Sequence, residues 1–556
     1  MKKMTSALFA GFFCAALAAN VFAGGRTQSQ STGGALPVVK VFSYFGIKGL
    51  FENTYWSKIM EEDLGIRLEN TQYTTELLMT TLASGNIPAD LFMSQQYNYV
   101  ENAIQAGLLY NLDDAKAKLP NLYANLAASL AYFRDNVNGG KTGTYAFGAN
   151  VTKTPPTVGT LNDGPYTRWD YYRELGYPEI VEFEDYLDVL KKMQDAHPVN
   201  ADGQRQYGII AFTDWDSMYA SFPSIALGFN GKREVGFLEV EGNGPAVGTI
   251  LDDDSAYKRG VKFLFRANQM GILDPASVSQ TYSEYNAKMN AGRGFFSPWS
   301  WSFQGFNTPD NNAQGIGYRL VPFRNQKMVR AGANYIGSSW SWAVVKNAKN
   351  LDKALALTDY LASYDGYWTY YNGRKGERWD LDANGEPYYT KLGWDIQTNA
   401  VVVPEMDRFN IGGAFVAPFA PQVVHPVYKR RADGADWIEK PEITGTSALS
   451  TIEADWRKVM GAKDDVELFN KWNIVIDSAL APLAPLPDNI QSINTRVGQV
   501  IAPMSWQAIL AKDEAEFETI WKNMVTEAKG RGFDQSVQWY REAWAQALAT
   551  GSRYMY

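Results

Sequence analysis

Three short apolar segments near the start of the chain decide its fold: V-V-K-V-F at 38–42, I-R-L-E-N-T at 66–71 and A-D-L-F-M-S at 89–94. Each has the length and the aliphatic or aromatic content of a buried strand. The helices expected between and after them are 52–63, 75–84 and about 100–106. This order, βαβαβα, predicts an open parallel sheet in an α/β protein.

Polar and aromatic residues follow the first and third of these strands. Ligands of open parallel sheets bind beyond the carboxyl ends of the strands. The residues that the sequence places at this edge are Tyr44, Lys48, Ser94, Gln95 and Tyr97. We therefore expect them beside a ligand.

The composition is that of a large globular protein. Of 556 residues, 46% are hydrophobic and 20% are charged, which predicts two or more domains. The net charge is -8 and no long basic block occurs, so we expect no nucleic-acid partner. Aromatic residues make up 14% of the chain, a content typical of proteins that present rings to ligands.

The N-terminus has the pattern of a secretory signal peptide. Lys2 and Lys3 precede an apolar run over 4–19, and short side chains lead to a cleavage site expected after Ala23. Residues 1–23 are thus a predicted signal peptide and 24–36 a flexible polar leader, which predicts a periplasmic or extracellular protein. Cys14, the only cysteine, lies in the apolar run, and lipid attachment there is the alternative to plain cleavage.

The stretch 292–304, G-R-G-F-F-S-P-W-S-W-S-F-Q, contains two closely spaced tryptophans. In an extended segment Trp299 and Trp301 share one face and Ser300 and Ser302 share the other. Adjacent indoles make an apolar wall with N–H donors at its rim, which suits a sugar ring. The alternative is a core strand beneath helices.

A second aromatic and acidic group follows the strand expected at 207–212. There Asp214, Trp215 and Asp216 come directly after the strand, at the same kind of ligand edge. A carboxylate beside an indole can bind sugar hydroxyls while the ring stacks on the sugar.

Signatures of an exported enzyme are missing from the sequence. His197 and His425 are each followed by proline, and neither belongs to an H-E-x-x-H motif. There is no G-x-S-x-G and no G-x-G-x-x-G. A glycosidase needs only two carboxylates at a suitable distance, so it stays open as the alternative to a binding protein. We expect no enzyme activity and no cofactor.

Several motifs resemble those of extracellular solute-binding proteins of ABC transporters of the maltose-binding type. They are A-S-G-N-I-P-A-D-L-F-M at 83–93, N-G-G-K-T-G-T-Y-A-F-G at 138–148, Y-T-R-W-D-Y-Y-R-E-L-G-Y-P at 166–178, G-F-F-S-P-W-S-W at 294–301 and G-S-S-W-S-W-A-V-V at 337–345. The segment 371–389 resembles the larger members that bind oligosaccharides and uronate-containing sugars. The paired helices expected at the C-terminus, interrupted by Gly530 and Gly532, fit the same subgroup.

The resemblance implies a two-lobed α/β fold with crossing hinge segments and a ligand cleft between the lobes. Lobe 1 would be 37–155 and 330–400, and lobe 2 would be 156–329 and 401–556. The protein would capture a carbohydrate by hinge closure and deliver it to a membrane permease, as a monomer; a peptide or another polar solute is the alternative ligand. The residues expected at the ligand are Trp299, Trp301, Trp340, Trp215, Asp214, Asp216, Gln95, Lys48, Tyr44, Tyr97 and Arg168.

Some relatives of this type hold a calcium ion in the turn that precedes the strand at 207–212. Here that turn reads H-P-V-N-A-D-G-Q-R-Q, and Asp202 is almost alone among its oxygen ligands. We therefore expect no metal there.

Overall fold

The computed structural model divides the chain into two compact units, Met1–Leu36 and Pro37–Tyr556. It describes residues 36–44, 48–152, 163–242, 244–331, 335–338, 340–397, 401, 403–404, 407, 417–420, 423–434, 436–444, 449–472, 475–478, 483–484, 486–551 and 554. The predicted signal peptide, its cleavage site and Cys14 lie outside these residues.

A six-stranded sheet forms around the three segments that open the sequence. Its order is β2-β3-β1-β4-β14-β5. The strands are β1 (Val38–Ser43), β2 (Gly49–Leu50), β3 (Arg67–Gln72), β4 (Leu91–Ser94), β5 (Phe147–Gly148) and β14 (Ser341–Val344). β1 pairs in parallel with both β3 and β4, as predicted. β14 joins β4 in antiparallel register, Trp342 opposite Met93, so the complete sheet is mixed.

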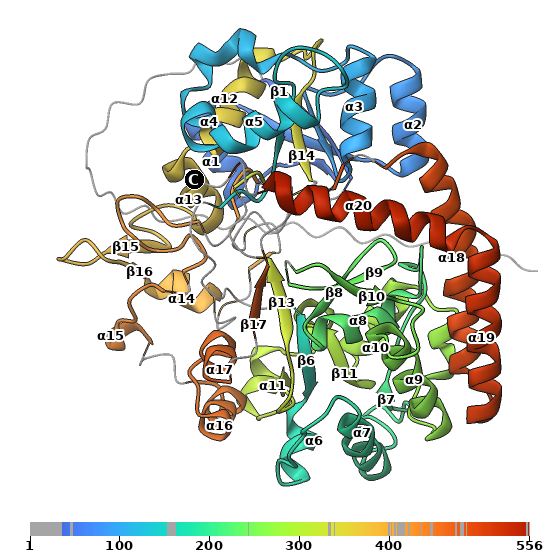
Figure 1. The fold of residues 1–556 in the computed structure, drawn as a ribbon. Helices are drawn as coiled ribbons and strands as arrows, with labels where there is room; N and C mark the ends of the chain where they lie inside the picture. Colours follow the sequence, from blue (N-terminus) through green and yellow to red (C-terminus); the bar gives the residue numbers. More distant parts are fainter. Residues whose placement is uncertain are drawn as a thin grey trace, which may run out of the picture. The chain divides into compact units, whose positions relative to one another are not determined.

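Both faces of this sheet are covered, which explains the unbroken apolar runs of its strands. Val41 and Leu91 belong to one buried cluster, whereas the next residues, Phe42 and Phe92, belong to another. Because side chains alternate along a strand, the two clusters lie on opposite faces. The covering helices, seen around β1 and β14 in Figure 1, are α1 (Tyr55–Leu64), α2 (Thr75–Ala83), α3 (Tyr97–Gln105), α4 (Pro120–Asn125), α5 (Ala127–Asn136), α12 (Leu351–Leu361) and α13 (Tyr364–Asn372), with a 3-10 turn at Leu112–Lys118.

A second, four-stranded sheet has the order β12-β6-β11-β7. Its strands are β6 (Asp163–Arg168), β7 (Tyr207–Ile209), β11 (Gly294–Trp299) and β12 (Tyr318–Leu320). β11 runs antiparallel to β6 and parallel to β7. The helices of this part are α6 (Trp169–Glu174), α7 (Asp185–Ala196), α8 (Ser221–Phe229), α9 (Ala256–Gln269), α10 (Tyr282–Asn290) and α11 (Pro309–Ala313), with 3-10 turns at Pro275–Val278 and Ser300–Phe303. The mixed α/β class expected from the sequence is confirmed.

The C-terminal helices extend the core of the second sheet. They are α16 (Thr451–Met460), α17 (Asp465–Lys471), α18 (Asp488–Ile509), α19 (Glu514–Gly530) and α20 (Phe533–Gly551), and Figure 1 shows the last three in red. Buried residues of α18, α19 and α20 share one hydrophobic cluster with the sheet. A meander of β8 (Lys232–Val235), β9 (Leu238–Glu241) and β10 (Ala246–Thr249) packs in the same cluster.

The described residues of 417–420, 423–434 and 436–437 pack differently from the division expected at residue 401. Phe419, Val423 and Trp437 lie in the core of the first sheet, where Trp437 stacks on Trp368 at 5.3 Å. Around them lie β15 (Trp379–Leu381), β16 (Pro387–Tyr389), α14 (Lys391–Gln397) and α15 (Pro441–Thr444). The chain therefore makes a further exchange between the two cores after residue 437.

Two strands stand outside these sheets: β13 (Met328–Ala331) and β17 (Val475–Ser478) pair in parallel and lie side by side in Figure 1. Among the described residues, no helix combines the length and the apolar content needed to cross a membrane.

Candidate functional site

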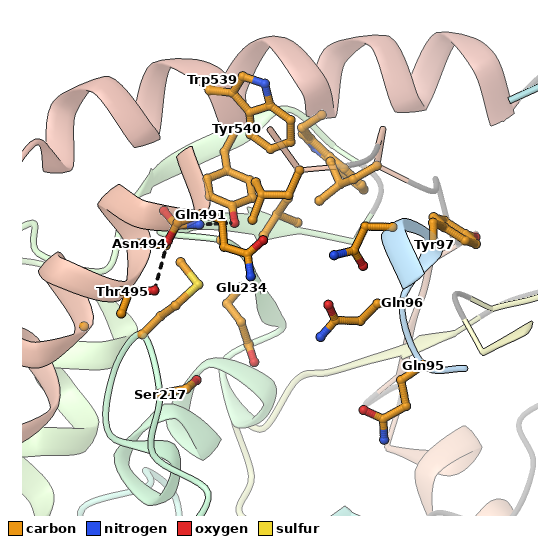
Figure 2. A pocket seen from close by; sticks show the side chains of 18 of the residues that line it. Gln95, Gln96, Tyr97, Ser217, Glu234, Gln491, Asn494, Thr495, Trp539 and Tyr540 are labelled. Atoms are coloured by element: carbon orange, nitrogen blue, oxygen red, sulfur yellow. Dashed lines mark hydrogen bonds between the residues drawn. The ribbon is translucent and has the colours of Figure 1, made fainter. Parts of the chain in front are cut away.

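A cavity of about 900 Å³ is lined by residues from both cores. One wall comes from the turn between β4 and α3, and the opposite wall comes from α18 and α20 (Figure 2). The loop after β7, the strand β8 and the residues Gly337, Ser338, Leu483, Ala484 and Leu486 also line it. A cavity of this volume can hold a ligand of several sugar rings.

The first wall begins where β4 ends, at the ligand edge predicted from the sequence. The Oγ atom of Ser94 accepts a hydrogen bond from the Gln96 amide and donates one to the Gln96 carbonyl, which fixes the turn. Gln95, Gln96 and Tyr97 then line the cavity. The ring of Tyr97 packs edge-on against Phe133 at 5.5 Å, and burial raises its pKa well above the ordinary value. The two glutamine side chains make no hydrogen bond to a described residue, so their amides can serve a ligand.

The opposite wall is held by a buried hydrogen-bond chain between α18 and α20. Nδ2 of Asn494 donates to the hydroxyl oxygen of Tyr540 at 2.8 Å, and the Ser536 hydroxyl donates to Oδ1 of Asn494 at 2.5 Å. Burial raises the pKa of Tyr540 to about 12. The neighbouring lining residues Gln491 and Trp539 add an amide and an indole to the cavity.

A glycine makes room for Tyr540 in this wall. Gly236 has a φ of 61°, and a Cβ atom at this position would lie 2.2 Å from a ring carbon of Tyr540. Only glycine satisfies both the backbone conformation and the close approach without a shift of the ring. The sequence did not predict that residues of α18 and α20 would line the cavity. Tyr540 and Trp544 lie on the apolar stripe of a helix, and such a stripe predicts packing in the core.

Asp216, one of the expected ligand residues, lines the cavity but already has protein partners. One carboxylate oxygen accepts from the backbone N–H and the hydroxyl of Ser221, and the other accepts from Nε1 of Trp506 at 2.7 Å. Burial raises the pKa of Asp216, while these hydrogen bonds oppose the rise. Asp216 therefore ties the loop after β7 to α8 and α18.

The W-S-W stretch takes a different backbone from the one expected. β11 ends at Trp299, and Ser300–Phe303 is a 3-10 turn. The side chains cause this ending: Ser297 Oγ accepts from the Trp299 amide, and Ser302 Oγ donates to the Trp299 carbonyl at 2.8 Å. Ser302 is consequently buried, and the predicted serine face of a strand is wrong.

The two indoles nevertheless lie side by side. Trp299 and Trp301 stack with ring centroids 5.9 Å apart and an interplanar angle of 24°. Trp215 meets Trp299 edge-on at 5.3 Å and stacks on Tyr282 at 4.7 Å. Trp215 is 44% exposed, whereas Trp299 is only 9% exposed, so Trp215 presents the larger open surface.

Asp214 lies beside this aromatic group and is exposed. Its carboxylate accepts a hydrogen bond from the amide of Tyr282 at 2.8 Å, at the start of α10. Neither Asp214 nor the three indoles line the large cavity, but Trp215 directly precedes the lining residue Asp216.

Trp340 lines a second, smaller pocket together with Tyr44, Gln95 and Trp342. Gln95 is a lining residue of both pockets, and the second has a volume of only about 10 Å³. Trp342, in β14, is fully buried and stacks on Phe147 at 6.2 Å, so it is the core member of the W-S-W triplet at 340–342. Lys48 is exposed and lines neither pocket.

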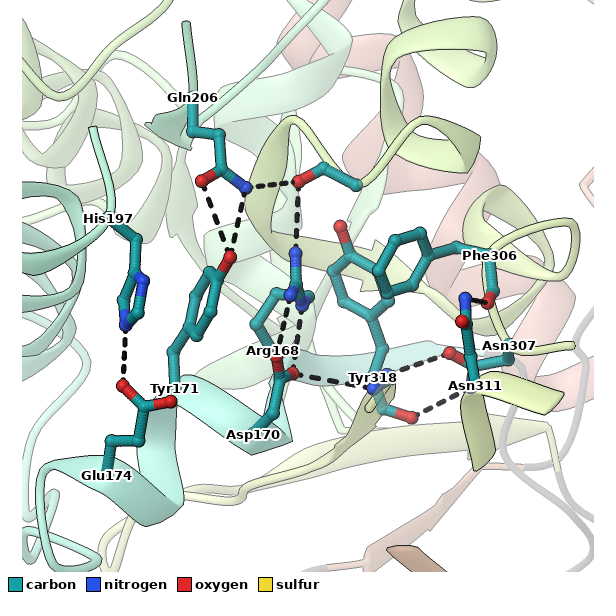
Figure 3. Close-up of polar contacts among 12 residues, drawn as sticks. Arg168, Asp170, Tyr171, Glu174, His197, Gln206, Phe306, Asn307, Asn311 and Tyr318 are labelled. Carbon is teal, nitrogen blue, oxygen red and sulfur yellow. Dashed lines mark hydrogen bonds and ion pairs between the residues drawn. The ribbon is translucent and has the colours of Figure 1, made fainter. Parts of the chain in front are cut away.

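The structure places Arg168 away from both pockets, in the core of the second sheet (Figure 3). Its Nε and Nη2 atoms donate to the two carboxylate oxygens of Asp170 at 2.9 and 2.6 Å, and Nη1 donates to the Gly292 carbonyl. Its guanidinium lies between the rings of Tyr171 and Phe306, at 4.0 and 4.5 Å. Burial disfavours the charged form, but the hydrogen bonds that Arg168 donates to the Asp170 carboxylate outweigh this effect and raise the pKa of Arg168. These contacts join the end of β6 to α6 and to the turn before β11, and they give Arg168 a structural role.

The turn at 197–206 is closed by an amide side chain. Oδ1 of Asn200 accepts from the amides of Asp202 and Gln204, and its Nδ2 donates to Gln204 and to the Ala291 carbonyl. Within the part of the chain that the structure describes, no group of three His, Cys, Asp or Glu side chains could hold a metal ion.

No protein-family model matches the chain, and no curated protein matches it. Several solved structures match its fold. FusA, an ABC-transporter substrate-binding protein of Streptococcus pneumoniae solved with kestose, superposes with a TM-score of 0.61 at 16% identity, covering 92% of this chain and 100% of its own. The alginate-binding protein AlgQ2 gives a TM-score of 0.57 at 15% identity, covering 93% and 100%. A solute-binding protein from Bifidobacterium longum infantis, described as binding HMO, gives 0.53 at 15%, covering 92% and 99%. The chain therefore has the two-lobed fold of ABC-transporter solute-binding proteins.

Proposed function

We propose that this protein is the extracytoplasmic solute-binding component of an ABC importer and that its ligand is an oligosaccharide. The observation that carries the proposal is the cavity, because its size and its amide and indole groups match a chain of sugar rings. The fold is shared with proteins whose descriptions name kestose, alginate and HMO. These similarities support a binding protein rather than a glycosidase.

Gln95 and Gln96 come from the first core, whereas Gln491 and Trp539 come from the second. A ligand that contacts both stabilises a closed arrangement by the free energy of the contacts that an open arrangement lacks. A membrane permease then recognises the closed form. Export after cleavage near Ala23 and a monomeric state belong to the same proposal.

We further propose that Trp215, Trp299 and Trp301 form a stacking wall beside the cavity, and that Trp340 and Tyr44 extend the site on the other side of Gln95. Trp215 directly precedes the lining residue Asp216, and Trp340 lines the small pocket together with Gln95, which also lines the cavity. Exposed indoles stack on the apolar faces of sugars and leave the ring hydroxyls to the amides.

The test is calorimetric titration of the mature chain with a panel of neutral and acidic oligosaccharides, with tryptophan fluorescence as a second readout. We expect at least one saccharide to bind and to raise the melting temperature. Mass spectrometry of the saccharide after long incubation should recover it intact. A panel with no binding member would refute the proposal, and a cleaved saccharide would replace it with a glycosidase.

A further inference from the structure

The last helix, α20, is anchored in the second core and also lines the cavity. Phe533 and Val537 belong to the hydrophobic cluster of the second sheet. Trp539, Tyr540 and Trp544 line the cavity. The helix has 19 residues and is therefore about 28 Å long. It crosses Figure 1, in red, between β1 and β11.

Beyond the end of α20, Tyr554 packs on the first core instead. Its ring meets that of Tyr132 edge-on, with centroids 5.4 Å apart. Its hydroxyl accepts a hydrogen bond from Nδ2 of Asn136 at 3.0 Å and donates one to the Asp135 carboxylate at 3.3 Å. All three partners belong to α5, one of the helices that cover the first sheet. A segment anchored in the second core thus ends on the first.

The contact between Tyr554 and α5 lies close to the first wall of the cavity. The ring centroids of Tyr132 and Tyr97 are 6.2 Å apart. Both rings also meet Phe133 edge-on, at 6.0 and 5.5 Å. Tyr97 begins α3 and lines the cavity. Tyr554 therefore contacts the first core on the side that carries the cavity wall.

The connection between α20 and Tyr554 is short. Tyr554 is the third residue after Gly551, at which the helix ends. Three residues span at most about 11 Å when fully extended. Because this length leaves little slack, a separation of the two walls must detach Tyr554 or unwind the end of α20. Contacts that exist in the closed arrangement and are lost in the open one favour closure.

We propose that Tyr554 is a clasp that favours the closed cavity, because it joins α20 of the second core to α5 of the first. Tyr554 is not among the described residues that line the cavity, so it acts as a positioning residue and not as a ligand contact. The inference goes beyond the proposed function, since it concerns the balance between open and closed forms without a ligand.

The experiment measures the distance between the two walls in the ligand-free mature chain. Spin labels at Gln96→Cys and Gln491→Cys mark the opposite walls, where both residues are exposed. Cys14, the only cysteine, precedes the predicted cleavage site, so the mature chain carries these two labels alone. We expect Tyr554→Ala to raise the population of longer distances about three- to tenfold, the range that the loss of one hydrogen bond gives.

Two further variants separate the ring from the hydroxyl. Tyr554→Phe keeps the ring on Tyr132 and loses the hydroxyl, so it should open the cavity less than Tyr554→Ala. Asn136→Ala removes the donor to the same hydroxyl. The double variant should therefore open the cavity little more than Tyr554→Phe alone.

The matched control is Tyr145→Ala. Tyr145 also packs at the edge of the cluster that receives Tyr554, but its hydroxyl donates to the Thr142 carbonyl, within the same part of the chain. Its truncation should leave the distances unchanged.

An unchanged distance distribution in Tyr554→Ala would overturn the inference, and so would a shift to shorter distances. Equal opening in Tyr145→Ala would also overturn it, because the effect would then be a general loosening of the first core. A saccharide panel without a binding member would refute the proposed function and leave the clasp standing, since the labels are read without a ligand.

Discussion

Trp299 and Trp215 should respond differently to truncation, although both belong to the same aromatic group. Five rings lie within 6.3 Å of Trp299: Phe212, Trp215, Phe222, Tyr285 and Trp301. Truncation of a buried tryptophan costs about 3–5 kcal/mol, so Trp299→Ala should lower the free energy of unfolding by roughly this amount. Trp215 contacts only the three rings of Phe212, Tyr282 and Trp299 and is half-exposed, so Trp215→Ala should cost less, about 1–2 kcal/mol.

Urea unfolding followed by circular dichroism measures these costs, and calorimetry with a bound saccharide measures the loss of affinity. We expect Trp215→Ala to weaken binding at least about tenfold while most of the stability remains. Trp299→Ala should lose stability first, and any loss of affinity in it then reflects the displaced neighbours as well. If Trp299→Ala proved as stable as the unaltered protein, the packing argument would be wrong. If Trp215→Ala bound its saccharide normally, Trp215 would not be part of the wall.

Three further changes test the scaffold of the site. Gly236→Ala should destabilise the protein by more than the roughly 1–2 kcal/mol that a left-handed φ costs an L-residue, because the added methyl group displaces the ring of Tyr540. Gly228→Ala is the control. It lies in a helix with open space at its Cβ and should not destabilise the protein. Asn494→Ala leaves two buried hydroxyls without their partner and should cost about 1–3 kcal/mol in urea unfolding; an unchanged midpoint would contradict the proposed hydrogen-bond chain. Burial raises the pKa of Asp465 to about 6, so between about pH 4 and 6 the folded state retains a proton that the unfolded state has already released. The free energy of unfolding should therefore fall as the pH rises through this range. Asp465→Asn should flatten this slope relative to the unaltered chain.

The strands and helices of the first sheet could be read from the sequence because their signal is local. The strand expected at 38–42 ends one residue before β1 does, and the strand expected at 66–71 is shifted by one residue from β3. The helix expected at 75–84 ends one residue after α2 does. A capping threonine starts α1 and Gly65, in the left-handed conformation, ends it. Such boundaries depend on residues close in sequence, which is why the pattern was sufficient.

The cavity wall from α18 and α20 could not be read in the same way. The stripe of Val537, Tyr540 and Trp544 shows that α20 is amphipathic, but not that its aromatic face also meets a cavity. The partner of Tyr540 is Asn494, 46 residues away, and no local pattern joins them. Arg168 was misplaced for the same reason, since the carboxylate two residues later gave no sign that the pair would be buried.

The two walls of the cavity differ in how far their polar groups are already committed. Asn494 and Tyr540 bind each other and are buried, so their positions are fixed before a ligand arrives. Gln95 and Gln96 make no side-chain hydrogen bond to a described residue, and long amide side chains lose rotamer freedom when they bind. On the proposed function, the rigid wall therefore supplies contacts at low entropic cost, whereas the glutamine wall must order its side chains when the ligand binds. Truncation of Gln95 or Gln96 removes contacts together with this entropic cost, so it should weaken binding less than the number of lost hydrogen bonds suggests.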